Sequence, residues 1–461
     1  TVDWTRRALA VDGVDDQAIR CGALVCLSAA QRALGDREEA RESADEATRL
    51  ARTTGDPLLL ASSAEALMLA RAGLGFDFGT TDHELRSLLA EALNGLLAGS
   101  EVQPAELSAS GPLEGGPSGL RWLPQEALAI AESQGQYALV ATAHLAVRMS
   151  IWRVDTLKQR LEADRLGLAA AERSNQPALL LNALLYLATD LTEAGQVAEA
   201  SERLDRIREV AAMIHQPAYD AFVDFFDSQQ ALTRGEYERS GTLVDRALTV
   251  GGHSHGVNAE LAWSGQVFIR SWDQGQMPGM VALLDMASAR APRATIFRAA
   301  RGRALVAAGR GEEIRDALGD EIRECWLDVN RDSVWLAIGG LFAEIVRALG
   351  VPDHARTVVQ HLEPYSGRIA VTGLGRASLG PVDRFLGIAS AAAGDLDVAA
   401  RYLRSAAELA ANSGAVAHEA RALHDLARVL DAGHDAAAKE EAGRFRAAAE
   451  ALAGPIGLVL P

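Results

Sequence analysis

Few side chains in this sequence have types and spacings that could support chemistry. His253 and His255 form a possible metal pair, but two imidazoles supply half of a tetrahedral zinc site, and no further ligand follows at a familiar spacing. We favour a solvated turn after Gly251 and Gly252 as the interpretation of this pair. We also assign no activated serine nucleophile in the sequence. We therefore predict no catalytic residue, no metal site and no cofactor.

Three arginines surround a glycine-rich segment and could hold an anion. The segment, residues 372–377, reads TGLGRA and looks like a fragment of a phosphate-binding loop, but we expect no strand before it in a βαβ unit. Arg368, Arg376 and Arg384 lie around it, and guanidinium groups match carboxylates and phosphates. Two interpretations stay open, namely an anion site and a turn between repeats.

A helical face with a tryptophan is the better candidate for ligand binding. Trp263, Gln266 and Arg270 follow one another at helical spacing, so they share one face of a helix. An indole combines a large apolar surface with one hydrogen-bond donor, which suits binding surfaces. Either this face lines a groove on the concave side of the molecule, or it packs between neighbouring repeats.

The elements that must position these residues are predicted to be helices. Ala, Leu, Arg and Glu dominate the 461 residues, and aromatic residues make up only 5%. The dominant residues are strong helix formers, whereas runs of β-branched and aromatic residues are nearly absent. We find no uncharged apolar stretch of about 18 residues, so no membrane span is expected. The composition therefore indicates an all-α protein.

A turn followed by a helix recurs along the chain with a period of about forty residues. Its glycines are Gly35, Gly195, Gly235, Gly275, Gly309, Gly350 and Gly394. Gly195, Gly235 and Gly275 are each 40 residues apart, and Gly35 precedes Gly195 by four such periods. A sustained period of this length is typical of stacked helical hairpins. We predict a superhelical array of tetratricopeptide-like repeats.

The composition of each unit explains how it folds. One helix ends at a glycine, which adopts the left-handed conformation without steric cost. Small residues such as Ala40, Ala44 and Ala47 then recur at helical spacing in the second helix, so that helix axes can approach closely. A polar turn with proline, as at Pro57 and Pro177, ends the unit because proline cannot continue a helix.

One segment interrupts the repeats and divides the chain. Residues 99–124 are dense in Gly, Pro and Ser, which rules out a regular helix over most of that length. We predict N-terminal helical repeats over residues 1–98, an inserted loop over residues 99–124, and the main superhelix over residues 125–461.

The C-terminal region, residues 328–430, contains three distinctive motifs: the turn YSGR at residues 365–368, the segment GLGRASLGPVDRFLG at residues 373–387 and the repeat turn at Gly394 and Asp395. With these motifs the region resembles the helical sensor region of STAND-class ATPases, which include large LuxR-type regulators, antibiotic-pathway regulators and cyclase-fused ATPases. Residues 263–275 add to this resemblance. The resemblance implies a superhelix that receives an inducer or a protein partner and relays the signal to ATPase and output domains.

The sequence departs from the complete pattern of that class in two ways. It has no G-x-x-x-x-G-K-[ST] loop, because its two lysines, Lys158 and Lys439, lie in other contexts. No helix-turn-helix follows the repeats. Either such domains belong to a longer protein of which this chain is a part, or the protein lacks them.

The net charge and the cysteine content restrict the classes of partner and the cell compartment that we expect. The net charge is −17, and so acidic a chain is poorly suited to contact nucleic acid directly. Cys21, Cys26 and Cys325 are too few for a disulfide framework and fit a reducing cytoplasm. We therefore expect a cytoplasmic binding protein whose partner is a small-molecule effector or another protein. The functional hypotheses are a ligand- or partner-sensing module of a regulator, a protein scaffold without a small ligand, and, less favoured, an enzyme with a pocket in the helical array.

Overall fold

The computed structural model describes most of the chain. The described residues are 2–9, 16–71, 87–89, 91, 92, 95, 125–255, 257–290, 292, 294–329, 331–374, 377–433 and 436–460. The predicted inserted loop, residues 99–124, lies outside them. Within the described residues, no helix is long and apolar enough to cross a membrane.

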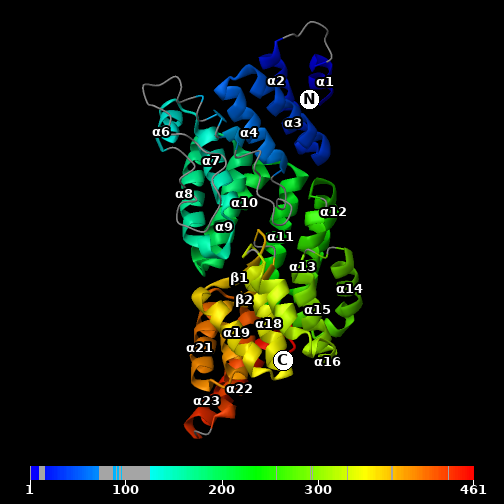
Figure 1. Cartoon of the computed structure of the whole chain (residues 1–461), viewed down its shortest axis with the longest axis vertical. Helices are drawn as coiled ribbons and strands as arrows, with labels where there is room; N and C mark the ends of the chain where they lie inside the picture. Colours follow the sequence, from blue (N-terminus) through cyan, green and yellow to red (C-terminus); the bar gives the residue numbers. More distant parts are fainter. Residues whose placement is uncertain are drawn as a thin grey trace.

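The chain forms an array of antiparallel helical hairpins, as predicted (Figure 1). The helices before the only β-hairpin of the described residues are α1 (Val2–Leu9), α2 (Gln17–Leu34), α3 (Arg37–Thr54), α4 (Pro57–Arg71), α6 (Gln125–Ser133), α7 (Tyr137–Ser150), η2 (Val154–Thr156), α8 (Leu157–Ser174), α9 (Pro177–Glu193), α10 (Val197–Ile214), α11 (Pro217–Arg234), α12 (Tyr237–His255), α13 (Val257–Asp273), η3 (Met277–Met280), α14 (Val281–Arg290), α15 (Ile296–Ala307), α16 (Glu312–Arg315), α17 (Leu318–Ile322), η4 (Arg323–Leu327), α18 (Trp335–Leu349), α19 (Pro352–Leu362) and η5 (Glu363–Tyr365). After it follow α20 (Val382–Ala392), α21 (Leu396–Asn412), α22 (Val416–Ala432) and α23 (Ala436–Ile456).

The predicted turns have the predicted backbone conformation. All seven repeat glycines have positive φ values, from 63° at Gly350 to 95° at Gly394. At the alternate turns, Asn175 and His215 adopt the same left-handed region, and Pro177 and Pro217 begin the helices that follow. Turn chemistry therefore sets the period of the array.

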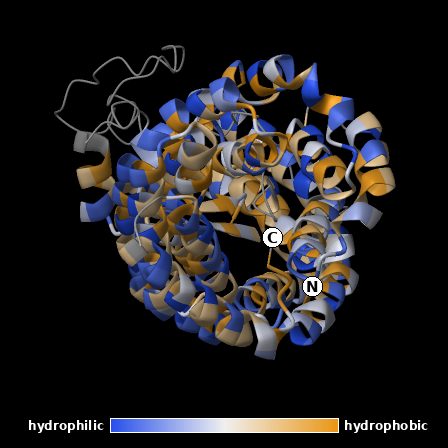
Figure 2. Cartoon of the chain, turned by 90° about the horizontal axis from the view of Figure 1, so that it is seen from below, coloured by the Kyte–Doolittle hydropathy of each residue, from blue (hydrophilic) through white to orange (hydrophobic). Residues whose placement is uncertain are grey.

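In the units that begin with α9, α11, α18 and α20, the first helix is buried on most of its surface and the second on one face only. Helix α9 buries a nearly continuous run from Leu181 to Leu191, whereas the buried positions of α10 form a single stripe that includes Ala200, Leu204 and Ile207. The first helices therefore form the inner layer of the array. Viewed along the long axis of the molecule, the helices are arranged as a ring (Figure 2).

A β-hairpin lies inside this array, and the sequence did not predict it. Strand β1 (Ile369–Thr372) pairs antiparallel with β2 (Ala377–Pro381), with an irregularity between Ala370 and Val371. Strand β1 contacts α9 and α18, and β2 contacts α11, α13, α20 and α22. The segment for which an anion site and a turn between repeats both stayed open thus connects β1 to β2. It follows a strand, but it leads into a second strand and not into a helix, so it is no dinucleotide-binding turn.

Two large apolar cores meet at the hairpin. Leu374, at its tip, belongs to the core of the N-terminal half, whereas Ala370, Ala377 and Leu379 belong to the core of the C-terminal half. Gly380 allows the close fit, because its φ of 100° excludes other residues and an added Cβ atom would lie 2.8 Å from Nδ1 of His418. The hairpin therefore joins the two halves of the array from within.

The backbone at the histidine pair also differs from expectation. Helix α12 continues through Gly251 and Gly252 to His255, where we predicted a solvated turn. The reason is that neither glycine adopts a left-handed conformation here, so the helix is not interrupted.

Candidate binding site

The predicted groove face of α13 packs against neighbouring helices. The Trp263 indole donates a hydrogen bond to Oδ1 of Asp245 at 2.8 Å, and Arg270 lies against Gly241 on α12. Gln266 is buried, and its Nε2 donates to the carbonyl oxygen of Phe225 at 2.8 Å. The structure thus places these three predicted residues along the contact with the preceding hairpin.

The predicted arginines do not come together around one anion. Arg376 lies outside the described residues. Arg368 donates from Nη1 to the carbonyl oxygen of Val154 at 2.6 Å and to Oε1 of Glu193 at 3.3 Å. Arg384 is fully buried and pairs with two carboxylates elsewhere, so the two described guanidinium groups both bind carboxylates of the chain itself.

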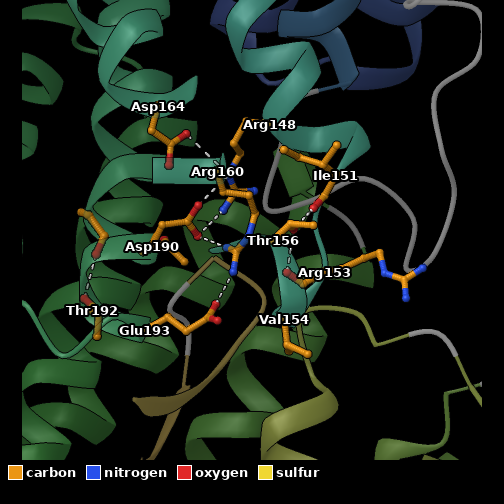
Figure 3. Close-up of polar contacts among 12 residues, drawn as sticks. Arg148, Ile151, Arg153, Val154, Thr156, Arg160, Asp164, Asp190, Thr192 and Glu193 are labelled. Atoms are coloured by element: carbon orange, nitrogen blue, oxygen red, sulfur yellow. Dashed lines mark hydrogen bonds and ion pairs between the residues drawn. The ribbon is translucent and has the colours of Figure 1, made fainter. Parts of the chain in front are cut away.

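The partner of Arg368 belongs to a buried ion-pair cluster on α7, α8 and α9, which consists of Arg148, Arg160, Asp164, Asp190 and Glu193 (Figure 3). Nη2 of Arg148 lies 2.7 Å from Oδ1 of Asp190, and Nη2 of Arg160 lies 2.7 Å from Oε2 of Glu193. Burial and the neighbouring Asp190 raise the pKa of Asp164 well above its usual value. The cluster fixes α7, α8 and α9 to one another, and Arg368 ties the base of the β-hairpin to them.

A second buried cluster connects four inner helices of the C-terminal half. It consists of Arg303 on α15, Glu344 and Arg347 on α18, Arg384 on α20 and Asp425 on α22. Nη2 of Arg384 lies 2.7 Å from Glu344 and 2.8 Å from Asp425. Burial raises the pKa of Glu344, but its arginine neighbours lower it more, so the net shift is downward. Glu344 is therefore ionised at neutral pH.

Aromatic and titratable groups extend this second cluster. Arg303 and Arg421 lie over the ring of Trp272, with 4.8 and 4.9 Å to its centroid. Arg421 also pairs with Asp273 at the end of α13. His418 is buried beside them, and burial together with the charges of Arg421 and Arg384 lowers its pKa to about 3. The imidazole is thus neutral at physiological pH.

An apolar pocket lies next to this cluster, between the β-hairpin and the helices α13, α15 and α18. Its volume is about 100 Å³. The lining residues are Leu261, Ser264, Gly265, Phe268, Ile269, Met280, Leu284, Ile296, Phe297, Ala300, Val334, Leu341, Thr372, Gly373, Ala377 and Leu379. Each wall comes from a different repeat or from the hairpin, so the pocket exists only in the assembled array.

The pocket uses the predicted helix but a different face of it. Leu261, Gly265 and Phe268 line it, and at about 100° per residue these positions lie on the opposite side of α13 from Trp263, Gln266 and Arg270. Sequence spacing alone cannot decide between these faces, because both carry apolar residues. The hairpin wall was missed as well, since residues 369–381 were not recognised as strands.

One sequence signal could have indicated this pocket. Three of the six methionines of the chain, Met277, Met280 and Met286, fall within ten residues. Methionine side chains are flexible and polarisable, and they are used at surfaces that adapt to varied apolar ligands. Met280 lines the pocket, and Met286 is 66% exposed on α14 beside it.

The described residues offer no cluster of three or more His, Cys, Asp or Glu side chains that could hold a metal ion. The side chains of His253 and His255 are not among those described.

Comparisons with known proteins give little further guidance. No protein-family profile matches the sequence, and no curated protein matches it. Among solved structures, 19 chains match. One is the crystal structure of yeast Tom70, which is 14% identical, with 98% of this chain and 91% of that chain covered and a TM-score of 0.31. The description of the fold therefore rests on the helical hairpins of this chain itself.

Proposed function

We propose that this chain is the ligand-sensing helical repeat module of a multidomain regulator, and that its effector is a small molecule bound in the pocket beside the β-hairpin. The observation that carries the proposal is the pocket itself, which is apolar, partly enclosed and built from several repeats. Such a pocket with a few polar groups is the usual form of a small-molecule site. The regulator context comes from the resemblance of residues 328–430 to STAND-class sensor regions.

The position of the pocket suggests how binding would be relayed. A bound molecule would touch α13 and α15, and also the hairpin residues Thr372 and Leu379. The hairpin in turn contacts α9 and α11 in the other half of the array. A ligand that fits one arrangement of the hairpin better than another shifts the population of the whole array towards it.

A cavity-filling variant tests this proposal. Gly265 lies on the pocket wall, and an added Cβ atom would meet only Ala377, at an ordinary 3.6 Å. Gly265→Leu should therefore fold and fill the pocket. Gly443→Leu, on the exposed side of α23 with nothing within 4 Å of an added Cβ, is the matched control.

The measurement is a thermal-shift screen against metabolites, because a ligand that binds only the native state raises the melting temperature by mass action. We expect a compound that shifts the native chain and the Gly443→Leu control but leaves Gly265→Leu unchanged. A shift that persists in Gly265→Leu would place the ligand elsewhere and refute the proposed site.

A protein scaffold without a small ligand is the second candidate. Leu283 and Met286 on α14 are 41% and 66% exposed, so this helix presents apolar surface to solvent. Capture of one defined partner, lost on Leu283→Ser with Met286→Ser and unaccompanied by any ligand-induced shift, would favour the scaffold. We prefer the sensor because the pocket is internal and α14 borders it.

A further inference from the structure

Among the residues that the structure describes, the pocket wall carries no ionisable side chain. The side-chain oxygen atoms of this described wall are the hydroxyls of Ser264 and Thr372, and its other described members are aliphatic, aromatic, thioether or glycine residues. An ionised group buried among such residues loses its hydration without gaining a partner, which is far more costly than burying a neutral polar group. The pocket wall therefore disfavours ligands that carry a charge.

The two hydroxyls also restrict the polar group of a ligand. Ser264 Oγ donates its hydrogen bond to the carbonyl oxygen of Leu261 at 3.0 Å, and Thr372 Oγ1 is directed to the carbonyl oxygen of Ala377 at 3.5 Å. A hydroxyl that donates in this way keeps lone pairs that accept. Both groups are thus arranged to receive a hydrogen bond from the ligand.

Nearby charges do not alter this conclusion. Ala300 and Leu341 line the pocket, and Arg303 and Glu344 follow them by three residues on the same helices. These two charged groups belong to the second buried cluster described above, in which Glu344 binds Arg347 at 2.6 Å and Arg384 at 2.7 Å. Arg303 is directed to the ring of Trp272. Neither Arg303 nor Glu344 is part of the pocket wall.

From these observations we infer that the pocket selects an uncharged, largely apolar molecule that carries a hydrogen-bond donor, such as an alcohol. This inference rests on the proposed function, because it specifies the ligand class of the same pocket. The volume of about 100 Å³ is smaller than the roughly 150 Å³ of an apolar cavity that holds benzene, so it suits a short alkyl segment. The pocket is only partly enclosed, so a longer chain can extend beyond it. The flexible Met280 side chain at the wall allows the pocket to adapt to modest differences in shape.

Three probes that are closely similar in size test the inference with the full chain. They are 1-octanol, heptyl methyl ether, which lacks the donor, and octanoate at pH 8, which is ionised. Dissociation constants are measured by saturation-transfer NMR titration. We expect octanol to bind best, the ether about 3- to 10-fold more weakly for loss of one hydrogen bond, and octanoate at least about 100-fold more weakly.

Variants of the pocket wall distinguish a wrong ligand class from a wrong binding site. Octanol binding should be lost in Gly265→Leu and kept in Gly443→Leu, and Ala300→Leu on the opposite wall provides a second filling variant if Gly265→Leu does not fold. Ser264→Ala combined with Thr372→Val should remove the advantage of octanol over the ether. Equal binding of octanoate and octanol, both sensitive to Gly265→Leu, would overturn the ligand class and leave the site standing. Binding of all three probes that is insensitive to both filling variants would overturn the site as well.

Discussion

At the scale of single residues, buried arginines hold the inner layer together. Arg384 is enclosed by Glu344 and Asp425, and removing one member of such a cluster leaves the others buried without compensation. We predict that Arg384→Ala lowers the free energy of unfolding by about 3–5 kcal/mol, measured by urea denaturation.

An exposed pair provides the control for this prediction. Arg356 and Asp353 form an ion pair on the outer helix α19, with 61% and 89% of their side chains exposed. Arg356→Ala should cost less than about 1 kcal/mol, because solvent screens such pairs. Equal losses for Arg384→Ala and Arg356→Ala would show that the buried cluster contributes no special stability.

His418 makes stability depend on pH. Its pKa in the folded chain is about 3, below the value of about 6.5 for an unfolded chain. Above pH 6.5 both states are neutral at this site. Below it, the unfolded state binds a proton that the folded state excludes, so stability falls as the pH is lowered towards 3.

We therefore predict that His418→Leu reduces the loss of stability between pH 7 and pH 4.5 by about 2–3 kcal/mol relative to the native chain. Urea titrations at both pH values measure this difference. The half-buried His354 on α19 supplies the matched control, His354→Leu. An unchanged pH profile in His418→Leu would show that the imidazole is not held neutral.

At the scale of elements, the hairpin depends on side chains from distant helices. The backbone N–H of Ser378 in β2 donates to Oε1 of Gln229 on α11 at 3.1 Å, and both residues are buried. We predict that Gln229→Leu leaves this N–H unsatisfied and destabilises the chain by about 1–3 kcal/mol. Hydrogen exchange should then speed up in residues 369–381.

The neighbouring Gln230 allows a matched control, since its side-chain oxygen accepts a hydrogen bond from the exposed side chain of Arg234 on the same helix. Gln230→Leu should leave the exchange of the hairpin unchanged. If Gln229→Leu also left it unchanged, the bond to Gln229 would not be what holds β2 in place.

The helices and strands also show which parts of the fold could be predicted from the sequence. Glycine at a helix end is a local signal, and all seven predicted glycine turns were confirmed by their positive φ values. The hairpin was missed because β1 has only four residues and is stabilised by α9 and α18, far away in the sequence. Short strands with distant partners leave no periodicity that a local pattern can reveal.

The site residues illustrate the same limit. The sequence predicted the helix of α13 and left open whether its face with Trp263 lines a groove or packs between repeats; in the structure Trp263 packs on α12 through Asp245. The buried ion pairs had a weak local signal, since Glu344 and Arg347 interrupt a helix whose other residues are apolar. Arg384 and Asp425 of the same cluster lie 40 and 81 residues beyond Glu344, so only the superhelix brings these residues together.

At the scale of the whole molecule, the array returns upon itself. A simple solenoid has contacts between neighbouring repeats only. Here α11 also contacts α22, and Ile456 at the end of α23 lies against Gly235 after α11. The segment after α23 lies against Gly275 after α13. The backbone N–H of Val459 donates to the carbonyl oxygen of Asp273 at 2.7 Å. These contacts join elements that are far apart in the array and add long-range cooperativity to it.

We predict that deleting residues 456–461 loosens this closure without unfolding the array. The deletion removes Ile456 from the end of α11, buried Leu458 and the bond from Val459, so the free energy of unfolding should fall by about 2–4 kcal/mol. Hydrogen exchange should speed up at the C-terminal ends of α11 and α13, next to Gly235 and Gly275, and stay unchanged in α2 and α3. Uniform acceleration along the chain would instead indicate that the terminal segment stabilises the array globally, and unchanged exchange at α11 and α13 would refute the closure.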